Sequence, residues 1–147
     1  MYSEKAKEHF INPQNAYRMQ DADAESSIGD PWCGDSLRMY IKVKDNIIEE
    51  ISYVVFACGA VIATSSVTSM LAKGKTLEEA SKITEKDIIE ALGGLPEEKK
   101  DCSNLVASAL KMVIQNYKDK RKKSIKWYDY EMNQQQNKNS EQIMNNT

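Results

Sequence analysis

The stretch that decides the fold is Leu37–Cys58, which reads LRMYIKVKDNIIEEISYVVFAC. In its first half apolar and polar side chains alternate, and this two-residue period is typical of a strand with one buried face. The apolar members are Leu37, Met39, Ile41 and Val43. Ile47–Phe56 predicts a second strand. Because the link Lys44–Asn46 is short and turn-prone, we expect the two strands to pair as an antiparallel hairpin.

Downstream of the hairpin the chain predicts four helices. Ala60–Lys73 is expected to form a buried helix that ends at Gly74, with apolar residues near helical spacing at Ile62, Val67, Met70 and Leu71. Capping patterns that begin at Thr76 and Thr84 predict two short helices before the break Gly93–Pro96.

The longest predicted helix opens at Asp101–Ser103, with Asp101 as the residue that caps it. One apolar stripe marks its buried side. The members of the stripe are Leu105, Val106, Ala109, Leu110, Val113, Ile114 and Tyr117.

Upstream of the hairpin, Ser3 is expected to cap a helix that runs to about Phe10 and stops at Asn12–Pro13. Gln14–Asp30 is a polar stretch that leads into the first cysteine segment. We therefore expect residues 1–123 to form one domain and residues 124–147 to form a polar, low-complexity tail that is mobile or marginally helical.

The composition indicates a chain that folds around an ordinary core. It has 147 residues, 41% of them hydrophobic, and a net charge of -2, so nothing attracts it generally to nucleic acid. The basic run Lys118–Lys123 is read as a solvated helix end. With neither a signal peptide nor a segment of roughly 20 apolar residues, we expect a cytoplasmic location without a membrane partner, where thiols stay reduced.

The three cysteines, Cys33, Cys58 and Cys102, lie in short polar or glycine-marked segments. Each alone is most simply a small buried apolar side chain, but three in such contexts favour a shared thiolate site. Cys58 precedes one predicted helix and Cys102 opens another, so we expect both thiols to lose their protons more easily than an ordinary cysteine. Asp35, two residues after Cys33, adds a carboxylate.

The chemistry of this residue set leaves two kinds of site open. The cysteines are 25 and 44 positions apart, which excludes a compact zinc knuckle and the ferredoxin spacings, so the fold must assemble the site. Three thiolates and a carboxylate could bind zinc tetrahedrally or ligate an iron–sulfur cluster, and the spacing does not choose between them.

Several segments resemble the U-type iron–sulfur cluster assembly scaffolds, the IscU family and the N-terminal domain of NifU, over about residues 1–123. They are Tyr2-Ser3-Glu4-Lys5, His9-Phe10, Asn12-Pro13, Cys33-Gly34-Asp35, Cys58–Ser66, Gly74–Ala80 and Cys102-Ser103-Asn104-Leu105. The resemblance implies a compact α+β domain in which a three-stranded antiparallel sheet packs with helices.

The same resemblance implies that Cys33, Asp35, Cys58 and Cys102 are the cluster or metal ligands. It implies a scaffold and not an enzyme: a cysteine desulfurase delivers sulfur, iron is supplied, a labile [2Fe-2S] cluster is built, and apo iron–sulfur proteins receive it. Cys102 is the candidate persulfide acceptor. Zinc is the candidate metal of the cluster-free form.

The chain departs from the family pattern at two places. Asp101 stands where many IscU proteins have a histidine, and we expect it to act next to the ligands and not as one of them. The only histidine, His9, matches one in the family's first helix and is expected to be structural. Leu95-Pro96-Glu97-Glu98-Lys99 differs from the Leu-Pro-Pro-Val-Lys site for an Hsp70-type chaperone, which weakens the expectation of that partner.

The residues by themselves also leave open a function of the enzyme class. One activated cysteine could make the protein a sulfurtransferase or desulfurase activator, with zinc bound by the other ligands. A purely structural zinc module is the weakest reading, because closed zinc sites seldom use aspartate.

Overall fold

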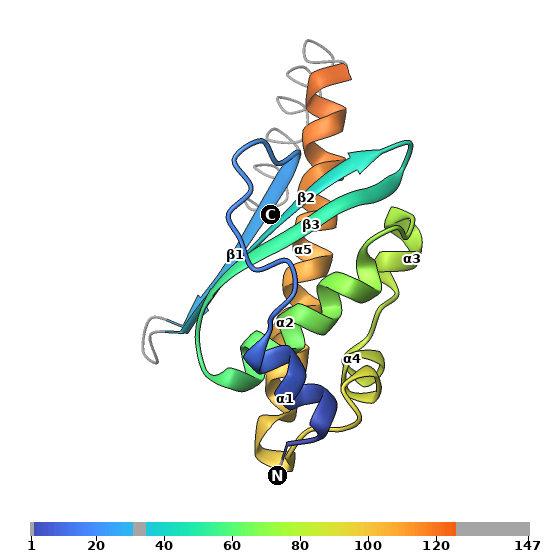
Figure 1. Ribbon diagram of the computed structural model, residues 1–147. Coiled ribbons are helices and arrows are strands. Elements are labelled where there is room, and N and C mark those ends of the chain that lie inside the picture. The colour runs from blue at the N-terminus through green and yellow to red at the C-terminus, as the bar shows by residue number, and fades with distance from the viewer. Residues whose placement is uncertain (1, 31–34, 126–147) are drawn as a thin grey trace, which may run out of the picture.

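The computed structural model describes residues 2–30 and 35–125 (Figure 1). In chain order its elements are α1 (Glu4–Ile11), β1 (Ala24–Asp30), β2 (Asp35–Lys44), β3 (Ile47–Phe56), α2 (Gly59–Ala72), α3 (Leu77–Ser81), α4 (Glu85–Ala91), the 3₁₀ turn η1 (Glu97–Lys99) and α5 (Lys100–Ile125). In the described part of the chain, no helix combines the length and apolarity needed to cross a bilayer. Of the predicted tail, Ser124 and Ile125 belong to α5, and the rest lies outside the described residues.

The predicted hairpin is confirmed. β2 and β3 pair antiparallel with Lys44 opposite Ile47, so Asp45 and Asn46 alone form the turn. Both turn residues have positive φ, 53° and 65°, which matches the twist that two-residue hairpins require and that Asp and Asn tolerate. With β1 added along β2, the sheet is three-stranded and antiparallel in the order β1-β2-β3, the fold class that the resemblance implied.

Strand β1 lies inside the polar segment Gln14–Asp30, where the sequence pattern predicted no strand. Its inward residues Ala24 and Ser26 are buried but small or polar, and Ile28 is the one large apolar side chain among them, so the hydrophobic alternation is weak. The Ser26 hydroxyl donates a hydrogen bond of 2.9 Å to the carbonyl of Ala109 in α5. This bond allows a polar residue to occupy an inward position of the strand.

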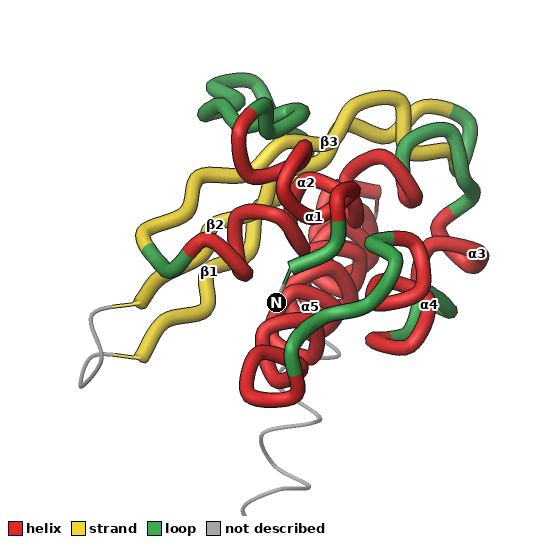
Figure 2. The backbone as a smooth tube through the Cα atoms, turned by 60° about the horizontal axis from the view of Figure 1, so that its bottom comes forward, coloured by secondary structure: helices red, strands yellow, loops and turns green. Residues whose placement is uncertain are grey.

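The two faces of the sheet are covered by different parts of the chain. α5 covers one face, against β1 and β2, and the connection between α1 and β1 crosses the opposite face (Figure 1). α2 contacts α1, α4, α5 and β3, so it is the most central of the helices (Figure 2). One core cluster joins inward residues of the strands, such as Met39 and Tyr53, to Leu110 and Val113 of α5.

Local signals placed most helix ends correctly. Ser3 caps α1, Thr76 caps α3, and Thr84 caps α4 in a reciprocal capping box with Asp87. Gly74, directly after the C-cap residue Lys73 of α2, has φ of +84°, a conformation that glycine adopts without strain.

The start of α5 differs from the prediction. The turn η1 runs directly into the helix at Lys100, and Asp101 therefore lies inside the first turn, exposed, instead of capping it. The expected cap was wrong because the preceding turn already provides the geometry that begins the helix.

Candidate functional site

Cys58 is the N-cap residue of α2, the place that the sequence predicted for it. Its backbone is extended, and its sulfur lies near the backbone N–H groups of Val61 and Ala60 in the first turn without forming a side-chain cap hydrogen bond. Partial burial alone would raise the pKa of this thiol. These N–H groups, the neighbouring Cys102 thiol and the charge of Lys99 outweigh that cost and lower its pKa below the ordinary value.

Cys102, in the first turn of α5, has the opposite property. It is half-buried, and burial, the nearby Cys58 sulfur and the carboxylate of Asp101 raise its pKa to about 11, although Lys99 opposes the shift. The expectation that both thiols would be acidic was therefore wrong for Cys102. A helix N-terminus favours one thiolate here, and a second negative sulfur in contact with the first is disfavoured.

The fold thus brings together two cysteines that are 44 positions apart in the sequence. The two thiols lie close enough to shift each other's pKa, at the N-terminal ends of α2 and α5. Cys58 is exposed at this junction, so a reagent can approach the pair from solvent. Two neighbouring sulfurs, one already inclined to ionise, are donor groups of the kind that soft metals favour.

The other two predicted ligands are placed only in part. Cys33 lies outside the described residues. Asp35 begins β2, where its backbone pairs with Asp30, and its side chain is outside the description. The register pairs Ser36 with Phe56, so β2 begins beside the strand end that leads two residues later to Cys58. Among the described side chains, no three acidic, histidine or cysteine groups gather in a metal-binding cluster.

His9 contacts α2 through a polar cluster. Its Nδ1 lies 2.6 Å from the hydroxyl oxygen of Ser66, and the same oxygen accepts a hydrogen bond of 2.9 Å from the backbone N–H of Gln14. Burial lowers the pKa of His9. The histidine therefore ties the end of α1 to the middle of α2.

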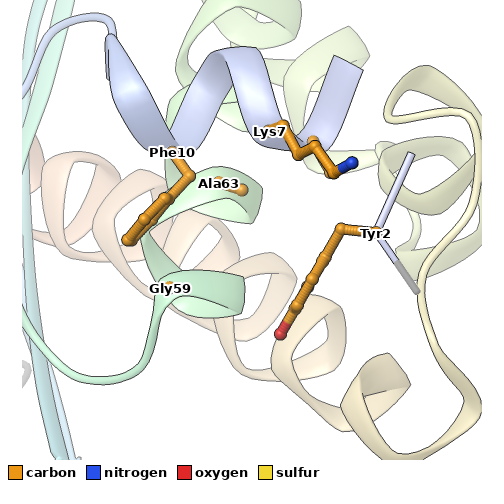
Figure 3. A pocket seen from close by; sticks show the side chains of 6 residues that line it. Tyr2, Lys7, Phe10, Gly59 and Ala63 are labelled. Carbon is orange, nitrogen blue, oxygen red and sulfur yellow. The ribbon is translucent and has the colours of Figure 1, made fainter. Parts of the chain in front are cut away.

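A cavity beside Cys58 was missed by the sequence analysis. It has a volume of about 280 Å³ and is lined by Tyr2, Ala6, Lys7, Phe10, Gly59 and Ala63 (Figure 3). A Cβ atom at Gly59 would lie 2.8 Å from the Phe10 ring, so glycine permits this close approach of α1 to α2. The glycine directly after Cys58 was the signal in the sequence, but only the packed helices show what approaches it.

Comparison with known proteins gives a consistent family. A model described as the NifU-like N terminal domain matches residues 1–124. Over 117 residues the chain is 54% identical to the iron–sulfur cluster assembly scaffold protein IscU 1 of Archaeoglobus fulgidus, covering 80% of this chain and 76% of that protein. It is 41% identical over 118 residues to the scaffold protein IscU of Aquifex aeolicus, covering 79% and 75%.

One longer relative and two solved structures extend the comparison. The chain is 41% identical over 119 residues to the nitrogen fixation protein NifU of Azotobacter chroococcum, covering 80% of this chain and 38% of that protein. A SUF-system scaffold from Fervidobacterium islandicum has TM-score 0.64 at 19% identity, covering 77% of this chain and 96% of that one. An N-terminal NifU-like protein from Brucella abortus has TM-score 0.62 at 20% identity, covering 80% and 94%. These two likenesses support the fold.

Proposed function

The chain belongs to the family of NifU-like N-terminal domains, and on that premise we propose that it is a scaffold for assembling an iron–sulfur cluster and passing it to apo-proteins. One observation carries the proposal: the exposed Cys58 and the half-buried Cys102 meet at two helix N-termini. Relatives up to 54% identical are named as cluster assembly scaffolds. The cluster is cargo in this role, so the site must both bind it and let it leave.

We propose a labile [2Fe-2S] cluster with Cys33, Asp35, Cys58 and Cys102 as its ligands. Thiolates are the usual ligands of such clusters, and a carboxylate is a harder, more exchangeable donor. The oxygen of Asp35 would therefore be the ligand that leaves first. In the cluster-free form the same four groups suit zinc.

Sulfur is proposed to come from a cysteine desulfurase by thiol–persulfide exchange. A scaffold thiolate attacks the outer sulfur of the desulfurase persulfide, the sulfur–sulfur bond breaks, and the desulfurase thiolate leaves. Cys102 is our proposed acceptor, and Asp101 acts on it through its charge. Cys58 is the competing acceptor, because its pKa is the lower of the two.

These steps assign partners by chemistry: a desulfurase that carries a persulfide and apo iron–sulfur proteins that accept the product. We place cluster assembly and transfer in the cytoplasm, where the thiols stay reduced. The altered segment Leu95–Lys99 gives no support to a dedicated Hsp70-type chaperone.

Anaerobic reconstitution with iron, cysteine and a desulfurase tests the function. The expected result is a visible [2Fe-2S] absorption spectrum and transfer of the cluster to apo-ferredoxin, with slower transfer from Asp35→Ala. Tightly bound zinc, stimulated sulfur turnover and no transferable iron would instead identify a sulfurtransferase or desulfurase activator. Mass spectrometry of the trapped persulfide then decides between Cys102 and Cys58.

A further inference from the structure

The face of the sheet opposite α5 has two unlike halves. Near the hairpin it is covered by the connection between α1 and β1 (Figure 1), and Ser52 is buried there. The charges of this half are paired: Lys42 lies 2.6 Å from Asp21, and the Tyr17 hydroxyl donates to Glu50. The connection therefore completes this half of the face.

The other half, toward the end of the sheet that leads to Cys58, is open. It contains a groove of about 290 Å³ that includes Arg18, Ser27, Ser36, Arg38, Val54 and Phe56 in its lining, and we call it the arginine groove. The strand register places Ser27 and Val54 on either side of Arg38, and Phe56 opposite Ser36. Phe56 is 75% exposed and Val54 37% exposed, so apolar surface lies next to the cationic groups.

Among the side chains that the structure describes, which exclude those of Asp30 and Asp35, the two arginines have no carboxylate partner. The ion pairs formed there involve lysines alone, and neither Arg18 nor Arg38 takes part in a hydrogen bond among the described residues. This is notable in a chain with net charge -2, which has an excess of acidic groups available. The arginine groove thus combines positive charge that no described carboxylate pairs with an exposed aromatic ring, the residue types that are enriched at protein interfaces.

We propose that the arginine groove docks an acidic segment of a partner protein, whose carboxylates bind Arg18 and Arg38 and whose apolar side chain covers Phe56 and Val54. Arginine binds carboxylates with paired, directional hydrogen bonds. A small phosphate-like anion fits less well, because the N–H groups of β2 pair with its neighbours and the groove offers no helix N-terminus.

The location suggests which partner is bound. Phe56 is two residues before Cys58, so a protein seated on the groove lies beside the candidate cluster site. This assignment rests on the proposed function: the partner is an apo iron–sulfur protein with an acidic surface. Docking there would steer the acceptor by charge and hold its ligands near the departing cluster.

The test measures binding of cluster-free protein to an acidic apo-ferredoxin by isothermal titration calorimetry. Arg18→Ala with Arg38→Ala is expected to weaken binding about tenfold and to flatten its dependence on salt, because two charge contacts are lost. Arg18→Lys with Arg38→Lys should restore part of the salt dependence. Lys44→Ala, which removes one positive charge from the exposed far end of β2, should change neither.

Each other outcome has a defined meaning. Unchanged affinity in the double alanine variant, with an unchanged thermal melt, overturns the docking proposal. Amide shifts at Ser27 and Arg38 on adding ATP or inorganic phosphate, with none on adding apo-ferredoxin, overturn it in favour of a small anion. Failure of the parent protein to build a cluster defeats the proposed function instead, and the binding measurement on cluster-free protein remains readable.

Discussion

The helices α2 and α5 each carry a candidate cysteine at the N-terminal end, but they are buried in different ways. α5 has one apolar side, with Val106, Leu110 and Val113 buried against the sheet. α2 is buried almost all round, and many of its buried residues are serines and threonines. Its predicted burial is confirmed, yet the apolar residue Met70 is 54% exposed.

The contrast shows that a central helix is shaped by its neighbours. α2 contacts elements on several sides, and small side chains let those elements approach closely. Several of the hydroxyl groups are satisfied within the helix: Thr64 donates to the carbonyl of Ala60 at 2.7 Å, and Thr68 donates to the carbonyl of Thr64 at 2.6 Å. A polar sequence can therefore be a core sequence when its hydroxyl groups bond to their own backbone.

The largest expected effect distinguishes the apolar burial of α5 from the burial of serine and threonine side chains in α2. Leu110→Ala in α5 should lower the free energy of unfolding by about 3 kcal/mol, because it leaves a cavity in the main core. Ser65→Ala in α2 should cost almost nothing, since the buried Ser65 hydroxyl has no hydrogen-bond partner to lose. Urea denaturation of both variants checks the pair. A loss of stability in Ser65→Ala equal to that in Leu110→Ala would show that α2 packs as α5 does.

The second prediction compares the two cysteines. At pH 7 to 8 the Cys58 thiol should be alkylated at least about tenfold faster than Cys102, because its pKa is lowered while that of Cys102 is raised to about 11. Peptide mapping after iodoacetamide treatment of metal-free protein measures both rates. In Cys58→Ser, Cys102 should react faster than in the parent, since the charge of the neighbouring sulfur is gone and only burial and the Asp101 carboxylate still raise its pKa. A slower reaction would mean that Cys58 does not perturb Cys102.

The third prediction concerns how α1 is held to α2. Ser66→Ala should lower the free energy of unfolding by about 1 to 2 kcal/mol, because it removes the group that His9 and the backbone of Gln14 both contact. Urea denaturation measures this loss. The matched control is Ser65→Ala, which removes a hydroxyl from the same helix without breaking a hydrogen bond.

The His9 contact also predicts a dependence on pH. Burial lowers the pKa of His9 from its ordinary value of 6.5, so the unfolded chain takes up the proton first as the pH falls. The contribution to stability is therefore complete above pH 6.5 and decreases below it. Stability curves between pH 8 and pH 5 should show a smaller decrease in His9→Asn than in the parent. An equal decrease would assign the pH dependence to other groups.

The smallest expected effect is at the start of α5. Asp101 does not cap the helix, so Asp101→Ala should change the free energy of unfolding by less than about 0.5 kcal/mol, whereas Thr84→Ala, at a true cap of α4, should cost about 1 kcal/mol. Thermal and urea melts compare the two. Asp101→Asn should also speed alkylation of Cys102, because the carboxylate helps to raise that pKa. A decrease of 1 kcal/mol or more in the free energy of unfolding of Asp101→Ala would show that Asp101 does cap α5.

Particular residues show how far the sequence analysis could reach at the candidate site. It placed Cys58 just before a helix and Cys102 at the start of another, and both positions are confirmed. It could not predict that their pKa values move apart, because that depends on the contact between the two sulfurs. The joint site of Cys33 and Asp35 with these two cysteines stays a prediction.

The sequence by itself determined the features that depend on residues close together in the chain. These are the hairpin, the capped ends of α1, α3 and α4, and the apolar stripe of α5. Caps, turns and periodicity act within a few residues, so they can be read locally. Only the tertiary structure decided that the polar strand β1 and the serine-rich helix α2 are buried, and that Cys58 and Cys102 titrate as a pair. Burial of small polar groups and charge coupling depend on residues far away in the chain, which only the packed fold brings into contact.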